Sequence, residues 1–168
     1  MTAQQGMVND LISNGCTDNK KIAFFNDFYE YSKQYKGVVL QPAEYGQSRY
    51  RFYFKSQYMA EVIGNGNAPL LYLRLKNVQN YVHELKLLPD YIQNKFKSNA
   101  DQCFKGCGHL GGTEEKCKSR VLYTHEDESY RRCVEHYFSF SELDIKLIPA
   151  YWRLLEMDFA LKMNTKEK

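Results

Sequence analysis

The sequence has no long uninterrupted apolar run, which limits where the protein can act. A helix that crosses a bilayer needs about 18 or more consecutive apolar residues, and no stretch of this chain approaches that length. The first residues, MTAQQGMVNDLISNG, show neither a basic leader nor an apolar central stretch. We therefore expect a cytoplasmic protein with no membrane partner, in a compartment whose reducing pools keep thiols out of disulfides.

A strong excess of charge of either sign is also missing. The formal net charge is +3, which is too small for nucleic-acid binding to be inferred from the total alone. Hydrophobic residues make up 43% of the 168 residues and charged ones 26%, as in ordinary folded proteins, so we predict a single domain over residues 1–168. Tyrosine is plentiful, with 14 copies, and it suits half-exposed surfaces because its ring is apolar and its hydroxyl is polar.

Familiar catalytic motifs are missing as well. The chain contains no HExxH, no HxE followed by PCxxC, no phosphate-binding P-loop and no GxSxG turn. GNGNAP at 64–69 lacks a third glycine and opens no helix, so we interpret it as a turn. A catalytic zinc needs an open coordination position beside a general base, and the nearby carboxylates are Glu114, Glu115, Glu126 and Glu135. The sequence leaves catalysis open and favours a protein that is not an enzyme.

Hydrophobic periodicity predicts the elements of the first half of the chain. Residues 1–10 look frayed, and apolar residues at helical spacing then predict a helix that begins after Asp18 and ends before Gly37. Residues 38–47 suit an edge strand that leads into a turn. Alternation predicts strands over 49–55 and 70–76, and a third strand lies in 59–69 with a turn near Asn65 and Gly66.

The second half predicts more helix, a hairpin and a final helix. Helical spacing over 78–88 is followed by Pro89, which can open a second helical segment. Residues 119–140 suit a hairpin with its turn at 127–129, and a capping arrangement of Ser141 with Asp144 precedes the last helix. The expected fold is therefore α+β, a small antiparallel sheet packed by helices. A helix, the antiparallel strands and a further helix occupy 18–100, the cysteine-rich knuckle and hairpin occupy 101–138, and a C-terminal helix occupies 141–163.

The last helix and the sheet both present apolar surfaces that need covering. The helix has an apolar stripe that ends at Met163 and includes Trp152, Leu155 and Phe159. We expect this stripe to pack on one side of the sheet, the side formed by Phe52, Phe54, Leu71 and Leu73.

Cysteine is scarce except in one segment, 101–136, which holds four of the five cysteines and three of the four histidines. A structural zinc ion takes four such donors at tetrahedral geometry, and glycines in this segment let the backbone fold closely around an ion. We predict one structural zinc ion bound by Cys103, Cys107, Cys117 and Cys133. His109 or His136 could replace one of these cysteines, and Cys16 lies outside the site. Free thiols, a disulfide, an iron–sulfur cluster and simple apolar packing of Cys133 stay as alternatives.

The run from Cys103 through CKSRVLYTHEDESYRRC to HYFSFSEL resembles the C-terminal part of small bacterial proteins of uncharacterised function. In those proteins a compact glycine- and cysteine-rich knuckle precedes a hairpin, a last cysteine and an aromatic segment that leads into a helix. Their first cysteines are more tightly spaced than Cys103, Cys107 and Cys117 are here. The resemblance implies a metal knuckle on a small α+β domain, and it carries no activity over.

Cations alternate with aromatic rings along two predicted strands, and the candidate binding residues there are Arg49, Arg51, Tyr53, Tyr72 and Arg74, with Lys55 and Lys76 beside them. Such a face can neutralise phosphates and stack on bases, although the exposed side of any antiparallel sheet carries similar residues. Three functions follow in order of preference. The first is a metal-stapled binding module for a small ligand or protein partner, with a structural rather than catalytic metal. A nucleic-acid-binding protein is second, and a thiol or zinc-release redox sensor is third.

Overall fold

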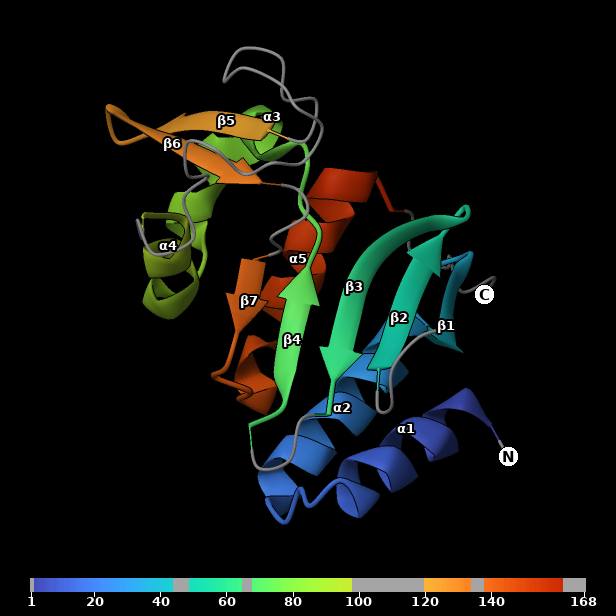
Figure 1. The fold of residues 1–168 in the computed structure, drawn as a ribbon. Helices are drawn as coiled ribbons and strands as arrows, with labels where there is room; N and C mark the ends of the chain where they lie inside the picture. The colour runs from blue at the N-terminus through green and yellow to red at the C-terminus, as the bar shows by residue number, and fades with distance from the viewer. Residues whose placement is uncertain (1, 44–48, 65–67, 98–119, 134–137, 162–168) are drawn as a thin grey trace, which may run out of the picture. The chain divides into compact units, whose positions relative to one another are not determined.

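The computed structural model describes residues 2–43, 49–64, 68–97, 120–133 and 138–161, and its helices and strands are labelled in Figure 1. The chain divides into two compact units. Unit 1 comprises Met1–Leu73 with Ser139–Lys168, and unit 2 comprises Arg74–Phe138. The combination of helices with a small antiparallel sheet confirms the α+β class. The single domain over 1–168 stays a prediction.

Unit 1 is built on a five-stranded sheet in the order β1-β2-β3-β4-β7 (Figure 1). The pairs β1–β2, β2–β3 and β3–β4 are antiparallel, and the bounds of these strands are β1 Val38–Pro42, β2 Arg49–Phe54, β3 Gln57–Ile63 and β4 Leu70–Leu73. These strands confirm the predicted edge strand and meander. β4 ends at Leu73 rather than at Lys76, and unit 2 begins at the next residue, Arg74. The turn expected near Asn65 and Gly66 lies outside the described residues.

The last strand of this sheet, β7 (Phe138–Phe140), corrects one prediction. Residues 138–140 were expected to end the hairpin over 119–140, but they lie beside β4 instead. Phe138 and Phe140 are buried and Ser139 between them is half-buried. Three residues are too few for such an alternation to identify a separate strand from the sequence.

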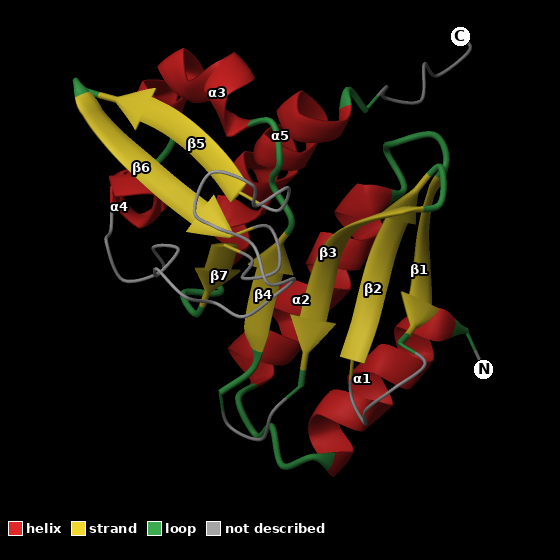
Figure 2. Ribbon diagram, turned by 45° about the horizontal axis from the view of Figure 1, so that its top comes forward, coloured by secondary structure: helices red, strands yellow, loops and turns green. Residues whose placement is uncertain are grey.

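Three helices cover one side of the unit 1 sheet: α1 (Ala3–Ser13), α2 (Asn19–Ser32) and α5 (Ile148–Phe159), with the short helix η3 (Ile145–Leu147) leading into α5 (Figure 2). The ring of Phe52 lies 5.2 Å from that of Phe28 and 5.9 Å from that of Trp152. The indole Nε1 of Trp152 donates to the Phe28 carbonyl at 3.2 Å. These contacts confirm that the C-terminal helix packs on the Phe52 side of the sheet.

Burial refines the core prediction at two positions. Leu71, Leu73 and Leu155 are fully buried, as expected. Phe54 and Phe159 are only half-buried, and each is the last residue of its element.

The expectation of frayed residues at 1–10 is wrong, since α1 occupies most of that segment. The Thr2 side chain caps the helix by accepting from the Gln5 N–H at 3.2 Å. Met7 and Leu11, one turn apart, are buried. Gly6 lets the helix approach β2 closely, because a Cβ there would lie 3.0 Å from the Tyr50 hydroxyl. Tertiary packing therefore orders a stretch whose sequence is largely polar.

Asp18 confirms its predicted role as a helix cap, whereas the cap before the last helix differs from the prediction, because Asp144 is the N-cap of η3 and α5 begins at Ile148 rather than 141. Asp18 caps α2 by accepting from the Lys20 N–H at 2.9 Å, and Asp144 accepts from the Lys146 N–H at 2.9 Å. α2 ends at Ser32, earlier than predicted, while Gly37 with φ of 82° turns the chain into β1. α5 has proline in its first turn and ends at Phe159 rather than 163, at the left-handed Ala160.

Unit 2 holds a two-stranded hairpin, β5 (Arg120–His125) with β6 (Glu128–Cys133), together with α3 (Val78–Tyr81), the 3-10 helix η1 (Val82–Leu87) and α4 (Asp90–Lys97). The Tyr123 hydroxyl donates to the Phe96 carbonyl at 2.7 Å, which joins the hairpin to α4. The turn is Glu126–Asp127, with φ of 51° and 66°, and not 127–129 as predicted. Positive φ at two successive residues is the type I′ geometry that matches hairpin twist.

None of the helices described in either unit combines the length and apolar character that crossing a bilayer requires. The cytoplasmic location stays a prediction.

Candidate ligand-binding face

The candidate site lies on the side of the unit 1 sheet opposite α1, α2 and α5. The register places Arg51 opposite Gln41 on β1 and Glu61 on β3, and Glu61 opposite Tyr72 on β4. Because paired residues share a side of a sheet, these residues line one surface. We call it the outer face, and its described members on β1–β4 are Val39, Gln41, Arg49, Arg51, Tyr53, Tyr58, Glu61, Ile63, Leu70 and Tyr72.

A β-bulge sets the composition of this face. The β2–β3 register shifts between Phe52 and Tyr53, so Phe52 pairs with Ala60 while Tyr53 pairs with Tyr58. The extra residue, Met59, is fully buried. Strict alternation would point Tyr58 away from Glu61, but the bulge brings both side chains to the outer face.

The hairpin turn between β2 and β3 fixes this register. Lys55 and Ser56 form a two-residue loop with φ of 47° and 62°, again the type I′ geometry. Lys55 was expected to extend the strand and point with Arg51. It lies in the turn instead, and its ammonium sits 5.1 Å from the Phe54 ring centre.

The centre of the outer face is an ion pair between a half-buried cation and a buried anion. The Arg51 Nε donates to Glu61 Oε1 at 3.0 Å, and the Tyr58 hydroxyl donates to Glu61 Oε2 at 2.8 Å. The Glu61 side chain is 3% exposed and that of Arg51 31%. Each carboxylate oxygen thus has a partner, which a buried charge requires.

The Arg51 guanidinium is held from two further directions. Its central carbon lies 4.9 Å from the Tyr58 ring centre, a cation–π distance. The rings of Tyr53 and Tyr58 are 6.0 Å apart at an angle of 45°. Burial lowers the pKa of Arg51, but hydrogen bonds to Tyr53 and Glu61 outweigh it and place the pKa above its usual value. The guanidinium is therefore a fixed, permanent cation.

The structure brings most of the predicted binding residues together. Arg49, Arg51, Tyr53 and Tyr72 share the outer face, whereas Arg74 belongs to unit 2. Sequence reasoning missed Tyr58 and Glu61. A signal for Glu61 existed, because a lone carboxylate in the apolar run MAEVI is unusual for a strand.

The predicted metal ligands cannot be placed in the same way. Cys103, Cys107, His109, Cys117 and His136 lie outside the described residues. The last predicted ligand, Cys133, ends β6. Within the described residues, no group of three or more His, Cys, Asp or Glu side chains could hold a metal ion.

The fifth cysteine, Cys16, is buried and free. Its thiol lies 4.0 Å from the Asp18 carbonyl oxygen, between α1 and α2. The expectation that it stands apart from the zinc ligands stays a prediction.

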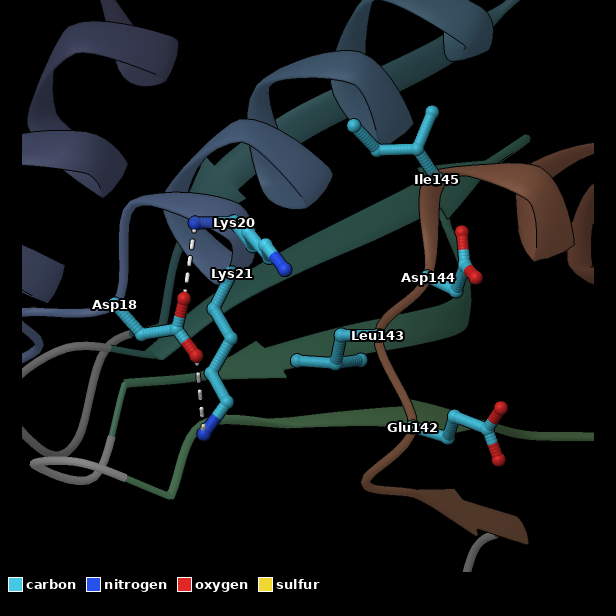
Figure 3. A pocket seen from close by; sticks show the side chains of 7 residues that line it. All are labelled: Asp18, Lys20, Lys21, Glu142, Leu143, Asp144 and Ile145. Carbon is cyan, nitrogen blue, oxygen red and sulfur yellow. Dashed lines mark hydrogen bonds and ion pairs between the residues drawn. The ribbon is translucent and has the colours of Figure 1, made fainter.

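A separate cleft of about 530 Å³ lies beside the start of α2 (Figure 3), and it is lined by Asp18, Lys20, Lys21, Glu142, Leu143, Asp144 and Ile145. In the figure Leu143 points toward α2, while the Asp144 and Glu142 carboxylates point away from it. Asp18 and Asp144 are already used as helix caps, and Asp18 also lies 3.9 Å from the Lys21 ammonium. Both aspartates and Lys21 therefore serve local structure, and the outer face is the better candidate site.

Comparisons with known proteins add no relative to this geometry. No protein-family model matches the chain, and neither a curated protein nor a solved structure is similar enough to be counted as a match.

Proposed function

We propose that the protein is a non-catalytic binding module, stapled by one structural zinc ion, whose outer face holds a small ligand or a protein partner. The observation that supports this function is the Arg51–Glu61 pair. The Glu61 side chain is 3% exposed, so its carboxylate has lost its hydration, which costs free energy. An apolar pair of similar volume is often as stable or more stable in such a position, so packing alone does not account for it.

The Arg51–Glu61 pair can serve in ligand recognition. A ligand binds more tightly when the groups that contact it are already held in place, because less conformational entropy is lost on binding. Glu61 and the Tyr58 ring fix the guanidinium on one edge and one side. The tyrosines add half-buried apolar surface with polar tips beside it. Ligand sites typically combine a small number of polar groups with aromatic rings.

The same pair disfavours nucleic acid as the partner. A nucleic-acid backbone needs a row of cations that release counterions, whereas the ion pair leaves the described members of the outer face with an excess of only one cation. Arg49 is then the remaining charged side chain of the outer face among its described members. Nucleic-acid binding therefore stays the second candidate.

The zinc staple rests on the cysteine and glycine content of 101–118 and on the position of Cys133 at the end of β6. A segment with few apolar groups recovers little free energy by burial, whereas thiolate coordination supplies it locally. The redox-sensor alternative needs an accessible thiol. Cys16 does not suit that role because it is 2% exposed.

Ligand-observed NMR with mixtures of small molecules tests the binding function. Saturation-transfer signals are expected with the wild type and reduced with Tyr53→Ala, because the variant removes a ring from the outer face. Tyr29→Ala is the matched control, since Tyr29 is another half-buried tyrosine of unit 1 but lies on α2. Equal signals from the two variants would place the binding elsewhere, and no signal from any mixture would argue against a small ligand.

A further inference from the structure

We infer that the outer face binds an oxyanion, a carboxylate or phosphate group of a small molecule, through the Arg51 guanidinium. This inference rests on the proposed binding function and names the chemistry of its ligand. Its basis is the way in which Arg51 is held, together with the balance of charge around it.

The first step concerns the hydrogen-bonding groups of Arg51. A guanidinium has five N–H donors in a planar fork. The Nε is engaged by Glu61 Oε1 at 3.0 Å, and Glu61 is itself held by the Tyr58 hydroxyl. Tyr53 also hydrogen-bonds to the Arg51 side chain. With 31% of its side chain exposed, Arg51 is reachable from solvent. A planar cation held in this way suits the paired oxygens of a carboxylate or phosphate.

The second step concerns charge. The described residues of the outer face carry two positive charges, those of Arg49 and Arg51, and one negative charge, that of Glu61. The face therefore keeps an excess of positive charge after the ion pair is formed. Electrostatic complementarity then favours an anionic ligand group over a neutral or cationic one.

The third step concerns the rest of the ligand. The Tyr58 ring lies 4.9 Å from the central carbon of the guanidinium, and the Tyr53 ring lies 6.0 Å from the Tyr58 ring. Both residues are half-buried. An oxyanion attached to a ring or a short apolar body can place its charge on Arg51 and its body against these rings. A compact molecule fits this arrangement better than a long polyanion, whose successive charges need a row of cations.

The test follows the Arg51 Nε–Hε signal in two-dimensional NMR during titration with inorganic phosphate and, separately, with benzoate. We expect a saturable shift with at least one of the two probes, and the stronger one identifies phosphate or carboxylate as the preferred group. Arg51→Lys keeps the charge but loses the planar fork, so it should weaken binding at least about tenfold. Arg153→Lys is the matched control, because Arg153 also pairs with a carboxylate, Glu156 at 2.8 Å, but lies on α5.

Three results would overturn the inference. They are no shift of the wild-type Arg51 signal with either probe, equal weakening in Arg51→Lys and Arg153→Lys, and undiminished binding to Arg51→Lys. The first of these uses only the wild-type protein, so poor folding of a variant does not obscure it. If neutral molecules bind in a manner that depends on Tyr53 while both anions fail, the proposed binding function stands and the oxyanion inference falls.

Discussion

Removing Arg51 should destabilise the protein more than removing the charge of Glu61, although the two residues form one ion pair. Arg51→Ala leaves a carboxylate at 3% exposure that keeps the hydrogen bond from the Tyr58 hydroxyl but has lost its cation. Breaking a fully buried pair in this way costs about 3–5 kcal/mol. Because the Arg51 side chain is 31% exposed, water partly replaces it, and we expect about 2–3 kcal/mol.

Glu61→Gln acts on the opposite side of the pair. The amide keeps the shape and an acceptor oxygen, and the Arg51 left behind reaches solvent. We expect a loss of about 1 kcal/mol. In the double variant no unpaired buried charge remains, so its loss should fall short of the sum by about 1–2 kcal/mol.

Equilibrium unfolding in urea, followed by circular dichroism, measures this cycle. The control cycle is Arg153→Ala with Glu156→Gln, an exposed pair on α5 with a comparable distance of 2.8 Å. Its coupling should stay below about 0.5 kcal/mol, as for surface pairs. The reasoning is refuted if the Arg51–Glu61 losses add within about 0.5 kcal/mol, or if Glu61→Gln is the more damaging single change.

Three further predictions concern the core, alkaline pH and the metal. Phe52→Ala should lower the free energy of unfolding by about 3–5 kcal/mol, since its ring is fully buried against Phe28 and Trp152; Val39→Ala, at a side chain 48% exposed, should change it by less than about 0.5 kcal/mol. Burial, with help from Glu156 and Tyr31, raises the pKa of Tyr35 to about 12. The unfolded chain loses this proton first, near pH 10, so stability should fall by up to about 2–3 kcal/mol between about pH 10 and 12, and urea unfolding of Tyr35→Phe should show a smaller fall. Metal analysis by mass spectrometry should find equimolar zinc in the wild type and in Cys16→Ser, and none after single serine substitution of Cys103, Cys107, Cys117 or Cys133; metal-free wild type would refute the staple, and zinc kept by Cys133→Ser but lost by His136→Ala would show a different fourth ligand.

Local sequence pattern was sufficient for elements that are long or strongly alternating. RYRFYFK alternates because one side of β2 packs on Phe28 and Trp152 while the other faces away. The start of α2 could be placed because Asp18 has the side chain that a helix cap needs. In such cases the local preference and the tertiary structure agree.

The missed features depend on contacts between distant parts of the chain. α1 is ordered in part by β2, because Tyr50 donates to Asp10 at 2.6 Å and packs against Gly6. No local sequence pattern predicts that contact. The bulge at Met59 is likewise invisible to a period-two pattern. Without it Tyr58 and Glu61 fall on opposite sides, so the pair around Arg51 could be recognised only from the strand register.

The most direct test of the binding function is a map of backbone amide shifts in isotopically labelled protein during titration with the strongest hit of the small-molecule screen. The account predicts that the shifted amides concentrate in β2 and β3, around Arg51, Tyr53, Tyr58 and Glu61. Shifts that gather instead at the cleft beside α2, around Lys20 and Leu143, would contradict it.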